Sequence, residues 1–169
     1  MFRIFGFPNP VNEVAARVVA AGVLLISGTT ILLTTLGGHS WLWLTVPLAY
    51  GFVARVLTGP RLSPLGQLAT KVVAPRVAEA KPVPGPPKRF AQGLGATFTI
   101  TALVLHFGFG ADIAALVVLG LVVVAATLES VFAFCIGCAI FAGLMRAGVI
   151  PDRICAECAN ISLREPRTV

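Results

Sequence analysis

Residues 113–145 read IAALVVLGLVVVAATLESVFAFCIGCAIFAGLM, and Glu129 is the only charged residue among them. A helix needs about 20 predominantly apolar residues to cross a bilayer core that is roughly 30 Å thick. This stretch is therefore long enough for a membrane-spanning helix, and it is longer than one crossing requires. Its length and its lack of charge indicate a membrane protein.

Three shorter apolar stretches precede it, at about residues 14–36, 41–57 and 90–109, and each fits one crossing. The composition agrees, because 57% of the residues are hydrophobic and only 12% are charged, whereas a soluble domain has about 25% charged residues. No short apolar segment ends in a small-residue cleavage site, so we expect the first crossing to be retained. We predict a single all-α membrane domain over residues 1–169, with four transmembrane helices arranged as two hairpins.

The basic residues are distributed asymmetrically. They fall near the start of the first crossing (Arg3, Arg17), from the end of the second crossing through the loop after it (Arg55, Arg61, Lys71, Arg76, Lys81, Lys88, Arg89), and in the C-terminal part (Arg146, Arg153, Arg164, Arg167). Under the positive-inside rule, this pattern places both termini, the loop 58–88 and the tail 146–169 in the cytoplasm. Topology thus accounts for the net charge of +6. We expect a lipid bilayer and no nucleic acid as partner, because no exposed aromatics alternate with the basic residues.

The central loop is rich in proline. Its last part, KPVPGPPKR at residues 81–89, is expected not to form a regular helix, because proline fixes φ and lacks an N–H. Residues 65–77 carry apolar side chains at helical spacing with Lys71 and Arg76 among them. This pattern fits either a short helix on the membrane surface or a solvated loop.

All four cysteines occur in Cys-x-x-Cys pairs, Cys135 with Cys138 in the last apolar stretch and Cys155 with Cys158 in the polar tail. Cysteines three residues apart on a helix share one side, so a disulfide within a pair or exchange between the pairs is feasible. In the cytoplasm such a disulfide would be transient and catalytic.

Two other interpretations of the cysteines remain open. The spacing of the two pairs lies within the range of four-thiolate zinc sites, in which Cys135, Cys138, Cys155 and Cys158 would all bind the metal. Alternatively, the first pair consists of small buried apolar residues, as free cysteines often are.

Glu129 is an acidic residue inside an apolar stretch, where an ionised carboxylate costs several kcal/mol. We expect it to be protonated, to face a wet cavity, or to pair with Arg17 or Arg55. It is a candidate proton relay for the thiols, although a pair that only fixes helix packing is equally consistent. If it instead lies on a transport path, the chain would need to form a homo-oligomer, because four helices are few for a pathway.

His39 and His106 lie near the two turns that lack basic residues. A metal site there would require both histidines and Asp112 to converge. The glycines within the helices, including Gly93 and Gly95, are expected to permit close helix contact.

The GPRLSP segment at residues 59–64, the KRFAQ segment at 88–92 and above all the FCIGC segment at 134–138 resemble a bacterial membrane family known as domain of unknown function 4395. The resemblance covers roughly residues 8–160. It implies a multi-pass protein of the bacterial inner membrane with four predicted helices and a thiol pair. The association of such proteins with thioredoxin-like and rhodanese-like proteins favours redox chemistry or sulfur transfer.

We therefore predict a membrane protein whose cytoplasm-facing dithiol, Cys135 and Cys138, exchanges electrons or sulfane sulfur with a soluble thioredoxin-like or rhodanese-like partner. Cys155 and Cys158 would form a second, resolving pair, and Glu129 would move protons. The alternatives are a non-enzymatic membrane protein with a structural four-cysteine zinc site, and a small transporter subunit.

Overall fold

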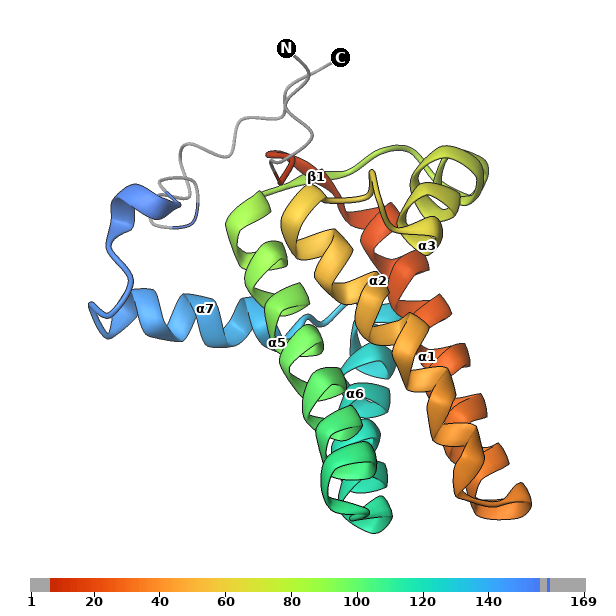
Figure 1. The fold of residues 1–169 in the computed structure, drawn as a ribbon. Coiled ribbons are helices and arrows are strands. Elements are labelled where there is room, and N and C mark those ends of the chain that lie inside the picture. Colours follow the sequence, from red (N-terminus) through yellow and green to blue (C-terminus); the bar gives the residue numbers. More distant parts are fainter. Residues whose placement is uncertain (1–6, 156–157, 159–169) are drawn as a thin grey trace.

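The computed structural model describes residues 7–155 and residue 158, and it consists mainly of helices (Figure 1). Within these residues, four helical segments are long and apolar enough to cross a membrane. In chain order they are Glu13–Gly37, His39–Thr58, Gly85–Gly108 and Asp112–Phe132. The prediction of four potential membrane-spanning helices is confirmed.

Each segment contains one long α-helix. These are α1 (Glu13–Gly37), α2 (Thr45–Thr58), α5 (Gly85–Leu103) and α6 (Asp112–Phe132). The 3-10 helix η1 (His39–Leu44) leads into α2, and the π-helical turn η3 (Val104–Gly108) continues α5. Along the bundle, α1 packs mainly against α6 and α2 mainly against α5.

The last apolar stretch forms two helices rather than the single one predicted over residues 113–145. α6 ends at Phe132, and α7 (Ile136–Arg146) then runs across the bundle and away from it (Figure 1). The chain turns at Ala133, whose φ of 56° is left-handed, while the N–H groups of Ala133 and Phe134 both donate to the carbonyl of Leu128. This C-terminal cap closes α6. The sequence did not predict the break between α6 and α7, because neither glycine nor proline stands at this turn.

The central loop is more helical than its prolines suggested. α5 begins at Gly85, so the prediction that all of residues 81–89 are non-helical is wrong. Pro86 and Pro87 fit the first turn, where a backbone N–H has no partner within the helix. Upstream, α3 (Pro64–Leu68), the π-helical turn η2 (Ala69–Val73) and α4 (Ala74–Val77) follow one another without a break and pack along α1. Residues 65–77 are thus helical, as one of the two interpretations held.

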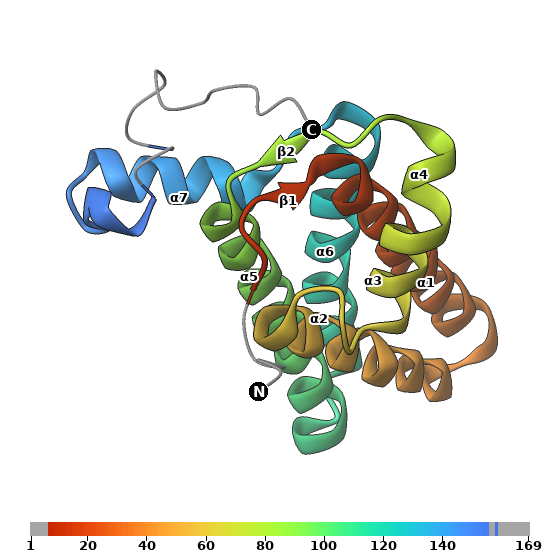
Figure 2. The same ribbon diagram turned by 90° about the horizontal axis from the view of Figure 1, so that it is seen from above.

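A short β-ladder ties the N-terminal segment to this loop. β1 (Val11–Asn12) pairs antiparallel with β2 (Pro82–Val83), and the two lie side by side in Figure 2. Asn12 also caps α1, because its side chain accepts the N–H of Val14 at 3.0 Å. The starts of α1 and α5 are therefore joined at one end of the bundle.

The interior of the bundle is built from small side chains, many of them polar. Several hydroxyls buried between the helices donate to carbonyls of their own helix, as Ser27 does to Val23 at 2.7 Å and Thr99 to Gly95 at 2.8 Å. Large apolar residues point outward instead, including Leu25 at 70% exposed and Ile113 at 78% exposed. Buried hydroxyls that bond to their own helix, together with bulky apolar side chains that face outward, are the pattern expected of helices that pack within lipid.

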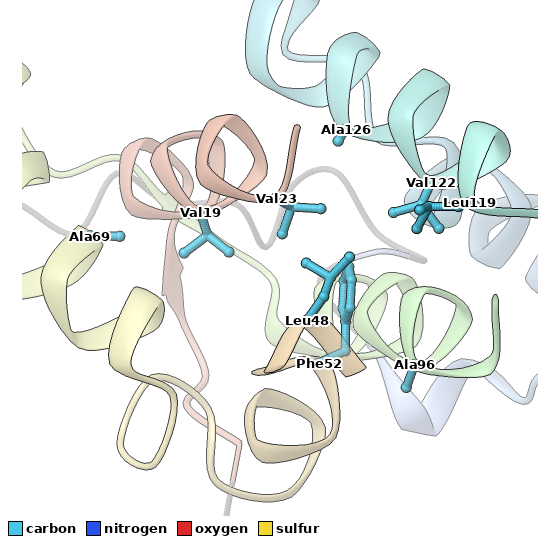
Figure 3. Close-up of a cluster of buried hydrophobic side chains, with 9 residues drawn as sticks. All are labelled: Val19, Val23, Leu48, Phe52, Ala69, Ala96, Leu119, Val122 and Ala126. Atoms are coloured by element: carbon cyan, nitrogen blue, oxygen red, sulfur yellow. The ribbon is translucent and has the colours of Figure 1, made fainter. Parts of the chain in front are cut away.

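The main apolar core lies where all four long helices meet, as Figure 3 shows. Its buried members are Val19, Val23, Leu48, Phe52, Ala69, Ala96, Leu119, Val122 and Ala126. The Phe52 ring sits against α5 at Gly95, where an added Cβ would lie 2.2 Å from a ring carbon. The expected close contact is thus present at Gly95, whereas Gly93 faces open space.

Candidate thiol site and charged end of the bundle

One end of the bundle collects charged side chains. Arg17 and Lys88 lie near the starts of α1 and α5, while Arg55 and Glu129 lie in the last turns of α2 and α6. These starts and ends lie together, as the bonds from Arg17 to the end of α6 and from Arg55 to α5 show. The chain after α6 leaves from this end, so Cys135 reaches the same place.

Lys88 and Glu129 form a buried ion pair. The distance from Nζ to Oε1 is 2.6 Å, and the side chains are 10% and 15% exposed. Such pairing lets a buried carboxylate keep its charge. The sequence proposed Arg17 or Arg55 as the partner; Lys88 was missed because it stands in the stretch predicted to be loop. Its position near the start of a crossing was the only available signal.

Arg17 has a different role. Its Nε and Nη2 donate to the carbonyl of Ser130 at 3.3 and 3.1 Å, and Nη2 also approaches the carbonyl of Val131 at 3.4 Å. These carbonyls end α6, where the helix leaves acceptors without partners in its own backbone. A cation there also complements the negative end of the helix dipole. Arg17 therefore secures the end of α6 from which the thiol segment departs.

Arg55 is held by neutral groups. Its Nε donates to Oε1 of Gln92 at 2.8 Å, its Nη1 donates to Oγ of Ser63 at 3.0 Å, and its guanidinium lies 4.6 Å from the centre of the Phe52 ring. The side chain is buried, yet Nη2 has no hydrogen-bond partner among the described residues.

Cys135 and Cys138 stand at the N-terminus of α7 rather than inside a membrane-spanning helix. Cys135 is the N-cap residue, and its Sγ accepts the backbone N–H of Cys138 at 3.4 Å. Gly137 between them is buried against α5, where a Cβ would lie 2.5 Å from Cβ of Ala91 and 2.6 Å from its Cα. Phe141 extends the contact by packing on Phe90, with ring centres 5.7 Å apart. These contacts hold the start of α7 beside Lys88.

The electrostatic surroundings separate the two thiols. The pKa of Cys135 is lowered, first because the Cys138 thiol donates a hydrogen bond to it, and further by the Lys88 charge and the Cys138 backbone N–H; burial and Glu129 oppose this. The pKa of Cys138 is raised by the same hydrogen bond, then by burial and by the negative charge of Cys135. A sulfur at a helix N-terminus is favoured as thiolate. Of the two thiols, Cys135 is therefore the one that loses its proton more readily.

Cys135 opens onto a cavity of about 70 Å³. Cys135, Gly137 and Glu129 line it together with Gln92 and Gly95 of α5. A space of this size admits a few water molecules. A carboxylate and a thiol that share such a cavity can exchange a proton through water.

Cys155 and Cys158 are joined in a disulfide, whereas Cys135 and Cys138 are free thiols. Among residues 7–155 and 158, no three His, Cys, Asp or Glu side chains form a group suited to a metal ion. The residues present thus do not fit the four-thiolate zinc site that the spacing allows. Residues 156–157 and 159–169 of the predicted cytoplasmic tail lie outside the described residues.

The opposite end of the bundle holds the two histidines. Nδ1 of His106 lies 2.5 Å from Oδ1 of Asp112, and Nδ1 of His39 lies 3.2 Å from Oδ2 of the same carboxylate. The three side chains therefore converge, as a metal site there would require. Both rings, however, approach the carboxylate itself, and they do not form a metal-binding group within the described part of the chain. The carboxylate instead links the two turns.

Comparison with known proteins identifies one family. The family model described as Domain of unknown function (DUF4395) matches residues 11–146, which include all four long helices and the Cys135–Cys138 pair. No curated protein and no solved structure matches the chain.

Proposed function

The chain belongs to the DUF4395 family, and from the geometry of its own residues we propose that it is a membrane-embedded thiol–disulfide exchange protein. The observation that carries the proposal is the position of Cys135. Its sulfur caps α7, accepts the N–H and thiol of Cys138, and feels the charge of Lys88. These three influences favour the thiolate, which is the reactive form of cysteine.

In the proposed reaction Cys135 attacks an incoming disulfide. Its thiolate bonds to one substrate sulfur, the substrate S–S bond breaks, and the departing thiolate takes up a proton. Cys138 then loses its proton and attacks Sγ of Cys135, which releases the second substrate thiolate and closes the Cys135–Cys138 disulfide. Two electrons pass from the protein dithiol to the substrate, which leaves as two thiols. The reverse sequence oxidises a substrate dithiol.

Glu129 and Lys88 serve this exchange from the side of the bundle. Glu129 lines the same cavity as Cys135 and accepts, through water, the proton that Cys138 releases. Lys88 holds that carboxylate in place through the 2.6 Å ion pair and favours the thiolate of Cys135. The position of Glu129 in this pair gives no support to a transport path through the bundle.

The second cysteine pair completes the proposed relay. Cys155 and Cys158 form a disulfide while Cys135 and Cys138 are reduced. One pair can therefore give electrons that the other can take, and a soluble thioredoxin-like protein would reset the relay. The same Cys135 thiolate can instead take the outer sulfur of a persulfide from a rhodanese-like donor, which leaves the donor as a thiolate and Cys135 as a persulfide.

We also infer the orientation of the chain. The charged end, with the thiols, both termini and the loop, faces the cytoplasm of a bacterial inner membrane, and the helices form two hairpins. The support is the distribution of Lys and Arg, which leaves the two opposite turns without basic residues. A membrane-impermeant maleimide applied to intact spheroplasts should then label Ser40→Cys at the far end and leave Cys135 unlabelled until the cells are permeabilised. Labelling of Cys135 in intact spheroplasts would contradict this orientation.

The exchange reaction is tested by trapping. Cells that produce the full chain are challenged with an oxidant, quenched with acid and treated with an alkylating mass tag. We expect the wild type to show reversible oxidation at Cys135 and Cys138, and Cys138→Ser to accumulate a mixed disulfide on Cys135, because the resolving thiol is absent. Cys135→Ser, which keeps Cys138, is the matched control and should trap nothing.

Two outcomes would overturn the proposal. One is that Cys135 and Cys138 stay reduced under the challenge and Cys138→Ser carries no adduct. The other is that the purified protein holds about one zinc ion per chain and that any single Cys→Ser change removes it, which would make the thiolates ligands. Addition of a single sulfur atom to Cys135, seen by mass spectrometry, would select sulfur transfer over disulfide exchange.

A further inference from the structure

A second, larger cavity lies beside the thiol cavity at the charged end. Its volume is about 290 Å³, and it is enclosed by the N-terminal segment, α1, the end of α2, the central loop and the start of α5. Most of its lining is apolar, from residues such as Pro8, Ala15 and Val19. The polar groups are few, and two of them are the cations Arg55 and Lys88.

Arg55 carries a buried charge that forms no ion pair among the described residues, and the carboxylate that attracts it, Glu129, is already paired with Lys88. The residue is 5% exposed, and its two hydrogen-bond acceptors, Gln92 and Ser63, are neutral. Its Nη2 has no partner among the described residues. A buried ionised group that is not compensated costs several kcal/mol. The cavity that Arg55 lines is where a compensating anion can be placed.

Lys88 adds donors to the same cavity. Its ammonium has three protons, and within the described part of the chain one of them is used in the bond to Glu129. Because that ion pair is neutral as a whole, the net charge facing the cavity is the single positive charge of Arg55. A ligand with one or two negative charges spread over several oxygens matches this arrangement, since Nη2 and Nζ can each donate to a different oxygen.

We propose that this cavity binds an oxyanion of the phosphate type, anchored by Nη2 of Arg55 and assisted by Lys88. The apolar remainder of the lining suits an acyl or other hydrocarbon portion attached to such a group. The shared chemistry is therefore a phosphate oxygen cluster, whether it belongs to the headgroup of a phospholipid or to free inorganic phosphate. None of the described cysteines lines this cavity, so anion binding can be tested without the thiols, although Lys88 takes part in both proposals.

The test uses the full chain purified in neutral detergent. Thermal unfolding and native mass spectrometry are followed while inorganic phosphate is titrated in one arm and phosphatidylglycerol in mixed micelles in the other, with phosphatidylcholine at equal concentration as the lipid control. We expect one arm to raise the melting temperature in a saturable manner. Saturation by phosphate identifies a free ion as sufficient, and saturation by phosphatidylglycerol alone identifies the lipid headgroup.

Arg55→Met keeps an unbranched side chain but removes the charge. We expect it to weaken binding at least about tenfold, because the lost contact is a buried charge-assisted one. Since Arg55→Met also removes the uncompensated charge, the ligand-free variant should fold and melt no lower than ligand-free wild type. Arg89→Met is the matched control: Arg89 is exposed at the same end and bonds to the carbonyl of Val56 at 3.0 Å. It should bind as wild type does.

Three results would overturn the proposal. The first is that neither phosphate nor phosphatidylglycerol changes the melting temperature. The second is that phosphatidylcholine acts as well as phosphatidylglycerol, which would show that the cavity selects hydrocarbon alone. The third is that Arg55→Met and Arg89→Met weaken binding equally, which would reduce the effect to the general charge of this end.

Discussion

The contact between Gly137 and α5 can be tested by adding one methyl group. In Gly137→Ala the new Cβ would lie 2.5 Å from Cβ of Ala91 and 2.6 Å from its Cα. Carbon atoms pack at about 3.5–4.0 Å, so the start of α7 must move away by about 1 Å or more. The obstacle is partly backbone of a long helix and cannot swing aside. Overpacking of this kind costs about 1–3 kcal/mol.

The helix preference of alanine works in the opposite direction. In the interior of a helix, Ala is about 1 kcal/mol more favourable than Gly. Gly143 provides the matched control, because it lies in the same helix α7 and an added Cβ there meets nothing within 4 Å. We therefore expect Gly143→Ala to raise the free energy of unfolding by up to about 1 kcal/mol. Gly137→Ala should lower it by about 1–3 kcal/mol.

The assay is unfolding of the purified full chain in mixed micelles by increasing mole fractions of sodium dodecyl sulfate, followed by circular dichroism. Alkylation of Cys135 is measured in parallel. Displacement of α7 from Lys88 should slow alkylation in Gly137→Ala at neutral pH and leave it unchanged in Gly143→Ala. If the two variants were equally stable, the packing of α7 on α5 described above would be refuted.

Three further predictions concern the same end of the molecule. Lys88→Met should lower the free energy of unfolding by about 3–5 kcal/mol, because Glu129 would be left buried and unpaired. The double variant with Glu129→Gln should recover most of this lost stability in detergent unfolding. Additive losses from the two changes would contradict the ion pair. Ala133→Gly should raise the free energy of unfolding by about 1 kcal/mol, since glycine adopts a left-handed φ without the penalty that Cβ causes; an unchanged or lower melting temperature would argue against the cap at the end of α6. The rate of iodoacetamide alkylation should begin to rise at a lower pH for Cys135 than for Cys138, because the pKa of Cys135 is lowered and that of Cys138 is raised. Lys88→Met should move the alkylation profile of Cys135 to higher pH. Indistinguishable profiles for the two thiols would count against a nucleophile and resolving pair.

Much of the fold follows from properties that can be read from each segment of the chain separately. The lengths of four apolar runs and the positions of the basic residues require no knowledge of which helix lies beside which. For this reason the four potential crossings agree with the structure to within a few residues at most ends. The break at Ala133 escaped because a left-handed alanine has no signature in residue type, and the extension of α5 to Gly85 escaped because prolines are compatible with a first helical turn.

The candidate site, too, was predictable in part from the sequence and in part only from the packing. The cysteines and Glu129 stand out because such residues are rare in apolar sequence, and the sequence alone marked them as candidates. The partner of Glu129 could not be deduced, since several cations, Arg89 among them, lie within a turn or so of helix ends and only packing selects Lys88. Arg17 and Arg55 were equally plausible partners from the sequence, but in the structure Arg17 bonds to the end of α6 and Arg55 bonds to Gln92.

By itself, then, the sequence determined that the chain has segments apolar enough to cross a membrane, how many there are, and which residues are candidates for chemistry. Hydropathy and charge are properties of each segment alone. The tertiary structure decided which of these residues meet. It placed Cys135 at the start of a separate helix, seated Gly137 on α5 and left Arg55 buried beside an open cavity. These features depend on contacts between segments far apart in the chain, where a shift of one helix by a single turn would change the partners of the charged groups on that helix.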